Sequence, residues 1–432
     1  MDDNFERFDM KMPPIRQKKI LRDIIKLVSN IELKNHKTVI ERVNMEGLKP
    51  PYLLLSNHNA FFDFFVAGNV VYPARANYVV AIDGFTTPTK KGGFKSREGI
   101  MRNAGCICKR KFTNDITLVR QLQTIIKNND VAIVYPEARY SLCGTEAPLP
   151  KSLGKLVKLL KVPVVTIICH GHHVNSPFYN VGDRKVKGTE ATLTQIVTKE
   201  ELDTIDTDEI NRRIYNQFKY DDYKWFKDKG LKMDYPKRAE GLHKVLYQCP
   251  HCMKEYYMSS KGNELFCESC GKKWIVKEDL SLESPTSDTE FTHIPDWYEW
   301  ERSNVKKEVE EGKYSFTTPV HVSSLPNSKG YIDLGKGTMT HDLNGFKVHV
   351  SGKYGDFDME IPAQSQYSVH IEYEYLGKYG DCVDLNTLTD TWYTYPECER
   401  FSVTKMSLAT EEIYLYLSRK NGIKPNIIEE DE

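Results

Sequence analysis

Apolar residues recur at spacings of three and four between residues 14 and 34, with Lys and Arg side chains between them. This periodicity predicts an amphipathic helix with a basic polar face. Such a helix can pack on the domain that follows it, lie on an anionic membrane surface, or do both with different edges. The apolar positions are Ile20, Leu21, Ile24, Ile25, Val28 and Ile31.

From about residue 43 to residue 185, short apolar runs alternate with stretches of helical periodicity. This order predicts an α/β fold with helices on both faces of a sheet. In such sheets, active sites collect in the loops beyond the strand ends. We expect strands at Tyr52–Ser56, Tyr78–Ile82, Val131–Tyr135 and Val162–Cys169, and helices at Ile116–Asn128 and Leu153–Lys161.

Composition and turn signals divide the rest of the chain. A stretch rich in Ser, Thr, Pro and acidic side chains is expected to be a linker. The Tyr-, Val- and Thr-rich remainder predicts a small β-barrel or sandwich closed by a helix from Leu408 to Lys420, an order faintly similar to a pleckstrin-homology-like domain. The expected segments are an N-terminal helical segment 1–40, the α/β domain 41–245, a cysteine-containing segment 246–280, the linker 281–312 and the mainly-β domain 313–425.

The overall composition is that of a globular protein, with 40% hydrophobic and 28% charged residues. Lys+Arg and Asp+Glu both number 60, and the chain ends in the acidic run Glu429–Glu432, so we do not expect nucleic acid as a partner. The sequence contains no uninterrupted apolar stretch of the roughly 20 residues that a membrane span needs. The N-terminus also lacks the pattern of a signal peptide. We therefore expect a cytoplasmic protein.

A histidine and a carboxylate lie together after the first predicted strand, in the run Ser56–Asp63. Acyl transfer from a thioester to a hydroxyl needs a base for the alcohol proton, and imidazole suits that role near neutral pH. A carboxylate on the other ring nitrogen orients the imidazole and stabilises its protonated form. On one straight helix, residues at this spacing would point about 140° apart. The two can therefore meet only if His58 lies in the loop and Asp63 in or near the first turn of the next helix.

Three further blocks follow in a recognisable order. Gly105–Lys111 ends a predicted strand with three cations, which suit a phosphate group; Val134–Ser141 leaves a strand through a turn; and Val162–Val165 begins another strand. Together with the first run, they resemble the 1-acyl-glycerol-3-phosphate acyltransferase family, which has Asn-His-x4-Asp, a Gly-rich strand ending in Arg, Pro-Glu-Gly-Thr-Arg-Ser and a Val-Pro strand. The resemblance covers roughly residues 40–190. It implies acylation of lysophosphatidic acid or a related lysophospholipid.

The resemblance also assigns roles to individual residues. It implies His58 as the general base and Asp63 as its orienting partner, with acyl-CoA or an acyl-carrier protein as the acyl donor. In the third block, Ala138, Arg139 and Tyr140 stand where the family has Gly, Thr and Arg. These departures bear on the head group of the acceptor more than on the chemistry. The acceptor-binding residues that the resemblance implies are Asn57, Arg110, Lys111, Glu137, Arg139 and Ser141.

Two cysteine pairs form a metal-binding pattern. Cys249-x2-Cys252 and Cys267-x2-Cys270 are separated by fourteen residues, an arrangement in which two tight turns supply four thiolates to a tetrahedral zinc ion. We predict a structural zinc ribbon, with Trp274 covering one side of its small core. Because protein ligands fill all four positions, the metal would have no open site for catalysis.

Other residues leave more than one interpretation open. The run Cys169–His173 is either a metal cluster or a structural element that lines the active site. Cys106 and Cys108 alternate on a predicted strand and are expected in the core. Four phenylalanines either line an acyl-chain channel or form the core face of a helix; they are Phe61, Phe62, Phe64 and Phe65.

These patterns predict an acyltransferase of phospholipid synthesis that is peripheral on the inner face of the membrane. The substrates are amphiphiles that reside in the bilayer, and the basic amphipathic helix offers a means of docking. The alternative is a catalytically inactive zinc-ribbon interaction or regulatory protein on an acyltransferase fold. The presence of His58, Asp63, Glu137 and the basic second block favours the enzyme.

Overall fold

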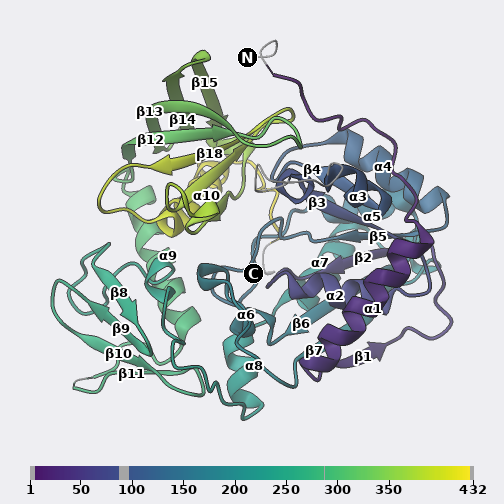
Figure 1. Ribbon diagram of the computed structural model, residues 1–432, viewed down its shortest axis with the longest axis horizontal. Helices are drawn as coiled ribbons and strands as arrows, with labels where there is room; N and C mark the ends of the chain where they lie inside the picture. The colour runs from purple at the N-terminus through teal and green to yellow at the C-terminus, as the bar shows by residue number, and fades with distance from the viewer. Residues whose placement is uncertain (1–4, 87–96, 287, 429–432) are drawn as a thin grey trace.

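The computed structural model describes residues 5–86, 97–286 and 288–428, and the acidic run at 429–432 lies outside them. The described residues form three β-sheets (Figure 1): a seven-stranded sheet in the N-terminal half, a four-stranded sheet, and a second seven-stranded sheet near the C-terminus. Among these residues, no helix is long and apolar enough to cross a membrane.

The first sheet has the strand order β1-β7-β6-β2-β5-β3-β4. Neighbouring strands are parallel except for β6 and β7, so the sheet is mixed. The four strands expected from the sequence correspond to β2, β3, β5 and β6. The bounds are β1 Val39–Val43, β2 Leu53–Ser56, β3 Ala76–Ala81, β4 Cys106–Lys109, β5 Val131–Val134, β6 Val164–His170 and β7 Glu190–Val197.

Helices cover both faces of this sheet. Successive side chains of a strand point to opposite faces, so each strand contributes to two cores. Leu54 belongs to a core that includes α1 and α2, whereas Leu53 and Leu55 belong to a second core with α4, α5 and α7. Cys106 and Cys108 are buried in the first of these cores. The predicted α/β arrangement is confirmed. The helices are α1 Lys19–Asn35, α2 Phe62–Val70, α3 Arg97–Asn103, α4 Ile116–Lys127, α5 Ser152–Leu160, α6 His172–Asn175, α7 Thr207–Phe218 and α8 Asp222–Asp228.

The four-stranded sheet lies beside the two cysteine pairs and has the order β11-β10-β9-β8. Trp274 of β10 is fully buried in its small core, and its ring meets Trp297 edge-on with 4.9 Å between the ring centroids. That Trp274 covers one side of the core of a zinc ribbon stays a prediction. The strands are β8 Met258–Lys261, β9 Glu264–Cys267, β10 Lys273–Val276 and β11 Leu282–Glu283.

The predicted linker is wrong over most of its length, because it contains the helix α9, Ile294–Glu310. The Ser-, Thr- and Pro-rich stretch suggested a linker, but it is followed by buried side chains at helical spacing: Trp297, Tyr298, Glu301, Val305 and Val309. This helix joins the small sheet to the C-terminal sheet (Figure 1) and packs against α10.

The C-terminal sheet has the order β15-β14-β13-β12-β18-β17-β16 and is antiparallel throughout. The closing helix α10, Val403–Lys420, begins before the predicted Leu408 because Ser402 caps it, accepting a hydrogen bond from the backbone N–H of Lys405. The similarity to a pleckstrin-homology-like domain stays a prediction. The strands are β12 Phe316–Ser324, β13 Ile332–Asp342, β14 Gly345–Gly352, β15 Gly355–Pro362, β16 His370–Glu372, β17 Cys382–Asn386 and β18 Thr391–Pro396.

Candidate active site

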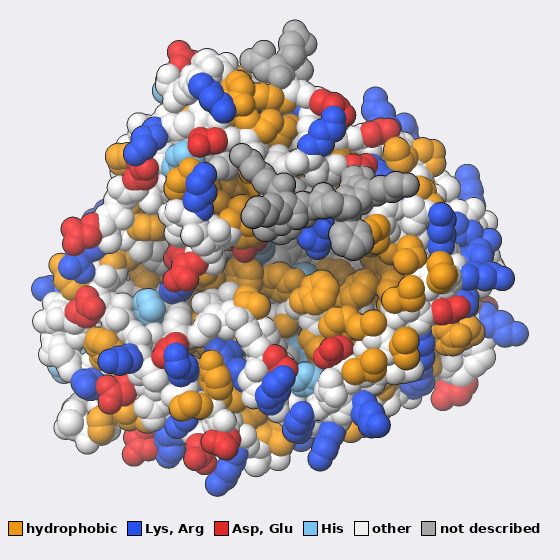
Figure 2. Space-filling model, in the orientation of Figure 1, with side chains coloured by type: hydrophobic (Ala, Val, Ile, Leu, Met, Phe, Trp, Pro, Cys, Tyr) orange, Lys and Arg blue, Asp and Glu red, His pale blue; other side chains and the backbone are white. Residues whose placement is uncertain are grey.

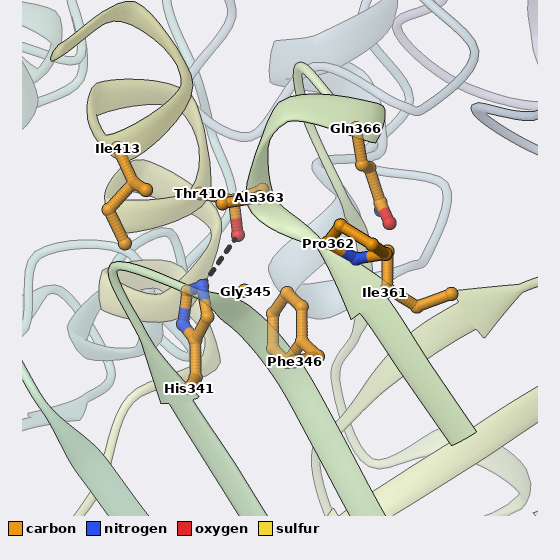
Figure 3. Close-up of a pocket in the computed structure, with 9 residues that line it drawn as sticks. All are labelled: His341, Gly345, Phe346, Ile361, Pro362, Ala363, Gln366, Thr410 and Ile413. Carbon is orange, nitrogen blue, oxygen red and sulfur yellow. Dashed lines mark hydrogen bonds between the residues drawn. The ribbon is translucent and has the colours of Figure 1, made fainter. Parts of the chain in front are cut away.

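A large cavity of about 1270 Å³ is lined by residues of both the α/β domain and the C-terminal domain, and His58 is one of them. Figure 2 shows a hollow in the middle of this face, with hydrophobic side chains inside and beside it. A second cavity, of about 10 Å³, lies between α10 and the strands β13 to β15 (Figure 3) and has room for about one water molecule. The large cavity is therefore the candidate active site.

His58 and Asp63 lie as their spacing requires. The histidine follows the end of β2 in a loop, and Asp63 lies in the first turn of α2. Nδ1 of His58 is 3.5 Å from Oδ2 of Asp63. This contact is longer than a formed hydrogen bond, as is common for catalytic pairs without a bound substrate. With Nδ1 facing the carboxylate, Nε2 is the ring nitrogen left to exchange a proton with a ligand.

The Asp63 carboxylate is fully buried and surrounded by donors. Its Oδ2 accepts hydrogen bonds from the backbone N–H groups of Asn59 at 2.6 Å and Ala60 at 3.0 Å, and its Oδ1 contacts Nδ1 of His172 at 2.5 Å. Burial raises the pKa of Asp63, but the interactions with His172 and His58 outweigh it and lower the pKa to about 2. The group is therefore a carboxylate at neutral pH.

His172 is a member of the site that the sequence did not single out. It belongs to the run Cys169–His173, for which a structural, site-lining role was one interpretation. Strand β6 ends at His170, and Gly171, with φ +84°, turns the chain into α6, so His170 and His172 do not share a strand face. A side chain at Gly171 would also lie 2.9 Å from the Trp225 ring. This turn brings His172 to Asp63.

The third block holds the loop that carries His58. The backbone N–H of His58 donates to Oε2 of Glu137 at 2.6 Å, and the His58 carbonyl accepts from the N–H of Ser141 at 2.8 Å. The imidazole lies between the rings of Tyr135 and Tyr140, with centroid distances of 4.4 and 4.2 Å. The departure from the family pattern at Tyr140 thus places an aromatic ring against His58.

Glu137 has a structural position rather than one facing the cavity. Its other oxygen, Oε1, accepts hydrogen bonds from the backbone N–H of Ala147 at 2.9 Å and from the Tyr220 hydroxyl at 3.2 Å. Burial raises the pKa of Glu137 to about 7, against the opposing effect of these donors. Among the described residues that line the cavity, Glu137 does not appear. Its contacts fix the backbone around His58.

Asn57 and Ser141 also make internal contacts. The side-chain amide of Asn57 donates to the carbonyl of Cys169 at 3.0 Å and accepts from the N–H of Cys169 at 2.8 Å, which joins the ends of β2 and β6. The Ser141 hydroxyl donates to the carbonyl of Thr145 at 2.6 Å. Both side chains are buried, and neither is among the described residues that line the cavity.

The three cations expected at an acceptor phosphate are placed differently from one another. The buried Arg110 guanidinium donates to the carbonyls of Leu325 at 3.1 Å and Pro326 at 3.0 Å and to the Thr391 hydroxyl at 2.7 Å, all in the C-terminal domain. It is not among the described cavity-lining residues, whereas Lys111 and Arg139 are. Arg139 pairs with the buried Glu411 at 3.0 Å. Lys111 and Arg139 therefore lie on the cavity wall, whereas Arg110 lies between the two domains.

The four phenylalanines divide between the two roles left open. Phe61 and Phe64 line the cavity. Phe62 is buried in the core of the first sheet, and Phe65 packs against that core. The aromatic side chains after His58 therefore serve both the core and the cavity wall.

The cysteine pairs converge on one point. Their Sγ atoms lie within 4.8 Å of one another, with 3.8 Å between those of Cys249 and Cys270 and between those of Cys252 and Cys267. Four thiols at these distances fit a single tetrahedral metal ion. Two other groups within the described residues have metal-ligand chemistry at similar spacing: Asp63, Cys169 and His172, and His370, Glu372 and Asp384.

One comparison with known proteins, the match to a family model, bears on the reaction class. Residues 30–170 match the family model described as Acyltransferase. The solved structures that match include the crystal structure of the 1-acyl-sn-glycerophosphate (LPA) acyltransferase PlsC from Thermotoga maritima, at 12% identity and a TM-score of 0.35, over 46% of this chain and 76% of that one. No curated protein matches the chain significantly. The match to the family model supports an acyltransferase and confirms the resemblance at that level.

Replacing Glu137 with Gln tests whether this residue holds the loop of His58, as its contacts indicate, or binds the acceptor, as the resemblance implies. The amide presents a donor where a carboxylate oxygen now accepts, so the loop that carries His58 should shift. We expect kcat to fall by about 10- to 100-fold, the scale of a small misplacement, while the KM of the acceptor changes by less than about threefold. Steady-state acyl-transfer kinetics at varied acceptor concentration measure both. Glu146→Gln in the same loop is the control. A raised KM with unchanged kcat would instead make Glu137 an acceptor-binding residue.

Proposed function

We propose that this protein transfers a fatty acyl group from an acyl thioester to the free hydroxyl of lysophosphatidic acid or a related lysophospholipid. The observation that carries the proposal is the pair of His58 and Asp63 at the wall of a large cavity. The pair lies within the residues that match the Acyltransferase model. The donor is acyl-CoA or an acyl-carrier protein.

In this mechanism, Nε2 of His58 takes the proton from the acceptor hydroxyl as its oxygen attacks the thioester carbonyl carbon. The ionised Asp63 stabilises the imidazolium that forms. When the tetrahedral intermediate collapses, the C–S bond breaks and the leaving thiolate takes the proton from His58. The products are the acylated acceptor and the free thiol, and the histidine returns to its starting state.

The cavity supplies an apolar surface for the acyl chain. Hydrophobic side chains from α1, α2, α3 and α5 line it, including Ile24, Ile25, Phe64, Met101 and Leu156. Burying each methylene of a fatty acyl chain on such a surface contributes about 0.8 kcal/mol. The same cavity can therefore hold both the thioester group of the donor, near His58, and its acyl chain.

Helix α1 is the proposed membrane-docking element. Ser29 and Leu33 are buried against the α/β domain, while the apolar side chains on its outer face are exposed, as at Ile20 (67%) and Leu27 (61%). Hydrophobic side chains gather over this helix in Figure 2, beside the hollow. Leu21, on the same helix, lines the cavity. These features support a peripheral enzyme on the inner face of the membrane, with its cavity next to the lipid surface.

For the cysteine cluster, we propose a structural zinc ion held by Cys249, Cys252, Cys267 and Cys270. The closed set of four thiolates supports a structural rather than a catalytic role. The regulatory alternative, an inactive acyltransferase fold, is disfavoured because His58 and Asp63 are both present at the wall of the cavity.

The first test removes the base. His58→Ala should lower turnover by roughly 10²–10⁴-fold, the range for loss of a general base, without unfolding the protein. Acyl transfer from acyl-CoA to lysophosphatidic acid is measured beside circular dichroism. His349→Ala, an exposed histidine on β14, is the matched control and should keep full activity. Wild-type-like turnover in folded His58→Ala protein would refute the mechanism.

The second test concerns the membrane. Replacing Ile20, Leu27 and Ile31 with Asn should strongly reduce co-sedimentation with anionic vesicles, because the apolar face then no longer enters the interface. Binding of the wild type should also weaken as salt rises, since each cation near the surface contributes about 1 kcal/mol. Val181→Asn, at an exposed apolar residue outside the helix, is the control. Undiminished binding of the triple variant would move the membrane contact elsewhere.

The third test concerns the metal. The purified protein should contain about one zinc ion per chain by elemental analysis, as four thiolates bind one ion. Cys252→Ser should lose the ion and lower the melting temperature, because binding free energy of a structural metal is folding free energy. Cys398→Ser, a half-buried cysteine outside the cluster, should retain it. Full zinc content in Cys252→Ser would show that the ion is bound elsewhere.

A further inference from the structure

The C-terminal domain forms one wall of the active-site cavity. Residues of this domain lie more than 300 positions after His58 in the sequence, yet they line the same space. The polar and aromatic ones include Gln364, Ser365, Tyr367, His370, Glu372 and Tyr375.

At this wall, three carboxylates surround one lysine. Nζ of Lys111 lies 3.4 Å from Oδ2 of Asp384 and 3.8 Å from Oδ2 of Asp83. Glu372 lies beside them, bonded through Oε1 to Nε2 of His370 at 3.0 Å. Burial lowers the pKa of Lys111, but Asp83 and Asp384 outweigh it and hold the pKa above its ordinary value, so the lysine is charged. The ammonium group of Lys111 is therefore paired with carboxylates of the protein and is not free to bind a phosphate group.

The charge of Lys111 does not offset the cost of burying Glu372 and Asp384 as carboxylates. Burial raises the pKa of Glu372 to about 8 and the pKa of Asp384 well above its ordinary value, despite the nearby lysine. The Arg139 and Lys109 side chains, which also line the cavity, are engaged by Glu411 at 3.0 Å and by the Thr113 hydroxyl at 3.0 Å. A further cation in the cavity would therefore stabilise the carboxylates.

An unsatisfied group and an aromatic surface face the same place. His370 is 2% exposed and lines the cavity, and its Nδ1 has no hydrogen-bond partner within the described part of the chain. Tyr375 lines the cavity next to Glu372, stacked on Tyr393 with 5.0 Å between centroids and bonded through its hydroxyl to Tyr331 at 2.6 Å. Tyrosine faces attract cations, ammonium groups among them.

A continuous row of rings connects this cluster to the base. The centroid distances are 4.2 Å from His58 to Tyr140, 5.2 Å from Tyr140 to Phe178 and 5.6 Å from Phe178 to His370. In a lysophospholipid whose free hydroxyl lies at His58, part of the glycerol and the phosphate separate that hydroxyl from the end of the head group. Asp83 and Glu372 line the same cavity as His58.

We propose that Asp83, Glu372 and Tyr375, which line the cavity, bind an ammonium group in the head group of the acceptor, so that the enzyme prefers an ammonium-bearing lysophospholipid over lysophosphatidic acid. The inference rests on the proposed acyl transfer. It agrees with the position of Arg110, whose guanidinium donates hydrogen bonds to the C-terminal domain rather than to an acceptor phosphate.

The test measures binding and turnover with matched acceptors. Short-chain lysophosphatidylethanolamine and lysophosphatidic acid serve as substrates, and analogues of both without the free hydroxyl serve as binding probes. The wild type should bind the ammonium analogue more tightly. Glu372→Gln and the more exposed Asp83→Asn should each weaken its binding by about tenfold or more, the scale of a lost hydrogen bond to a charged group, and leave the phosphate analogue within about threefold. Glu360→Gln, exposed on β15, is the control.

The outcomes separate the two levels of the argument. If the phosphate analogue binds as tightly as the ammonium analogue to the wild type, or if Glu372→Gln weakens both equally, the head-group inference is wrong even when acyl transfer is observed. If the binding preference holds and responds to both variants but no acceptor is acylated, the ligand class stands and the proposed acyl transfer is wrong.

Discussion

The buried carboxylate of Asp63 is the interaction on which the site depends. Removing a carboxylate from water is costly, and here two backbone N–H groups and two imidazoles offset the cost. These groups come from the loop after β2 and from the start of α6, and their contacts hold both segments against Asp63 in the first turn of α2. The orientation of His58 follows from this arrangement, as does the position of the cavity wall next to it.

Much of the α/β domain could be predicted because its signals are local. The strands β2, β3, β5 and β6 follow from short apolar runs. The pairing of His58 with Asp63 was implied by the resemblance, and helix geometry gave the condition under which two residues at this spacing can meet. The helix α9 was not predicted, because the acidic and Ser-rich segment before it suggested a linker. The helical spacing of Trp297, Val305 and Val309, which the structure buries, was the signal that could have identified it. Local composition is a weak guide where tertiary packing decides the element.

The part of the site that could not be predicted consists of contacts between residues far apart in the chain. His172 reaches Asp63 through a turn at Gly171, and Arg110 reaches Thr391 across a domain boundary. The family pattern suggested that Glu137 and Arg110 face the acceptor, whereas the structure has one bracing the loop of His58 and the other joining domains. A motif identifies residue types, but the direction in which each side chain points depends on its neighbours in the fold.

The placement of Arg110 limits how this protein can be rearranged in evolution. The Arg110 guanidinium donates hydrogen bonds to two carbonyls and a hydroxyl of the C-terminal domain. The C-terminal domain therefore completes the buried interior next to β4. Exchange of the C-terminal domain for one without matching acceptors would leave a buried charged group without partners beside β4, at a cost of several kcal/mol. The acyltransferase domain is therefore not an interchangeable module here.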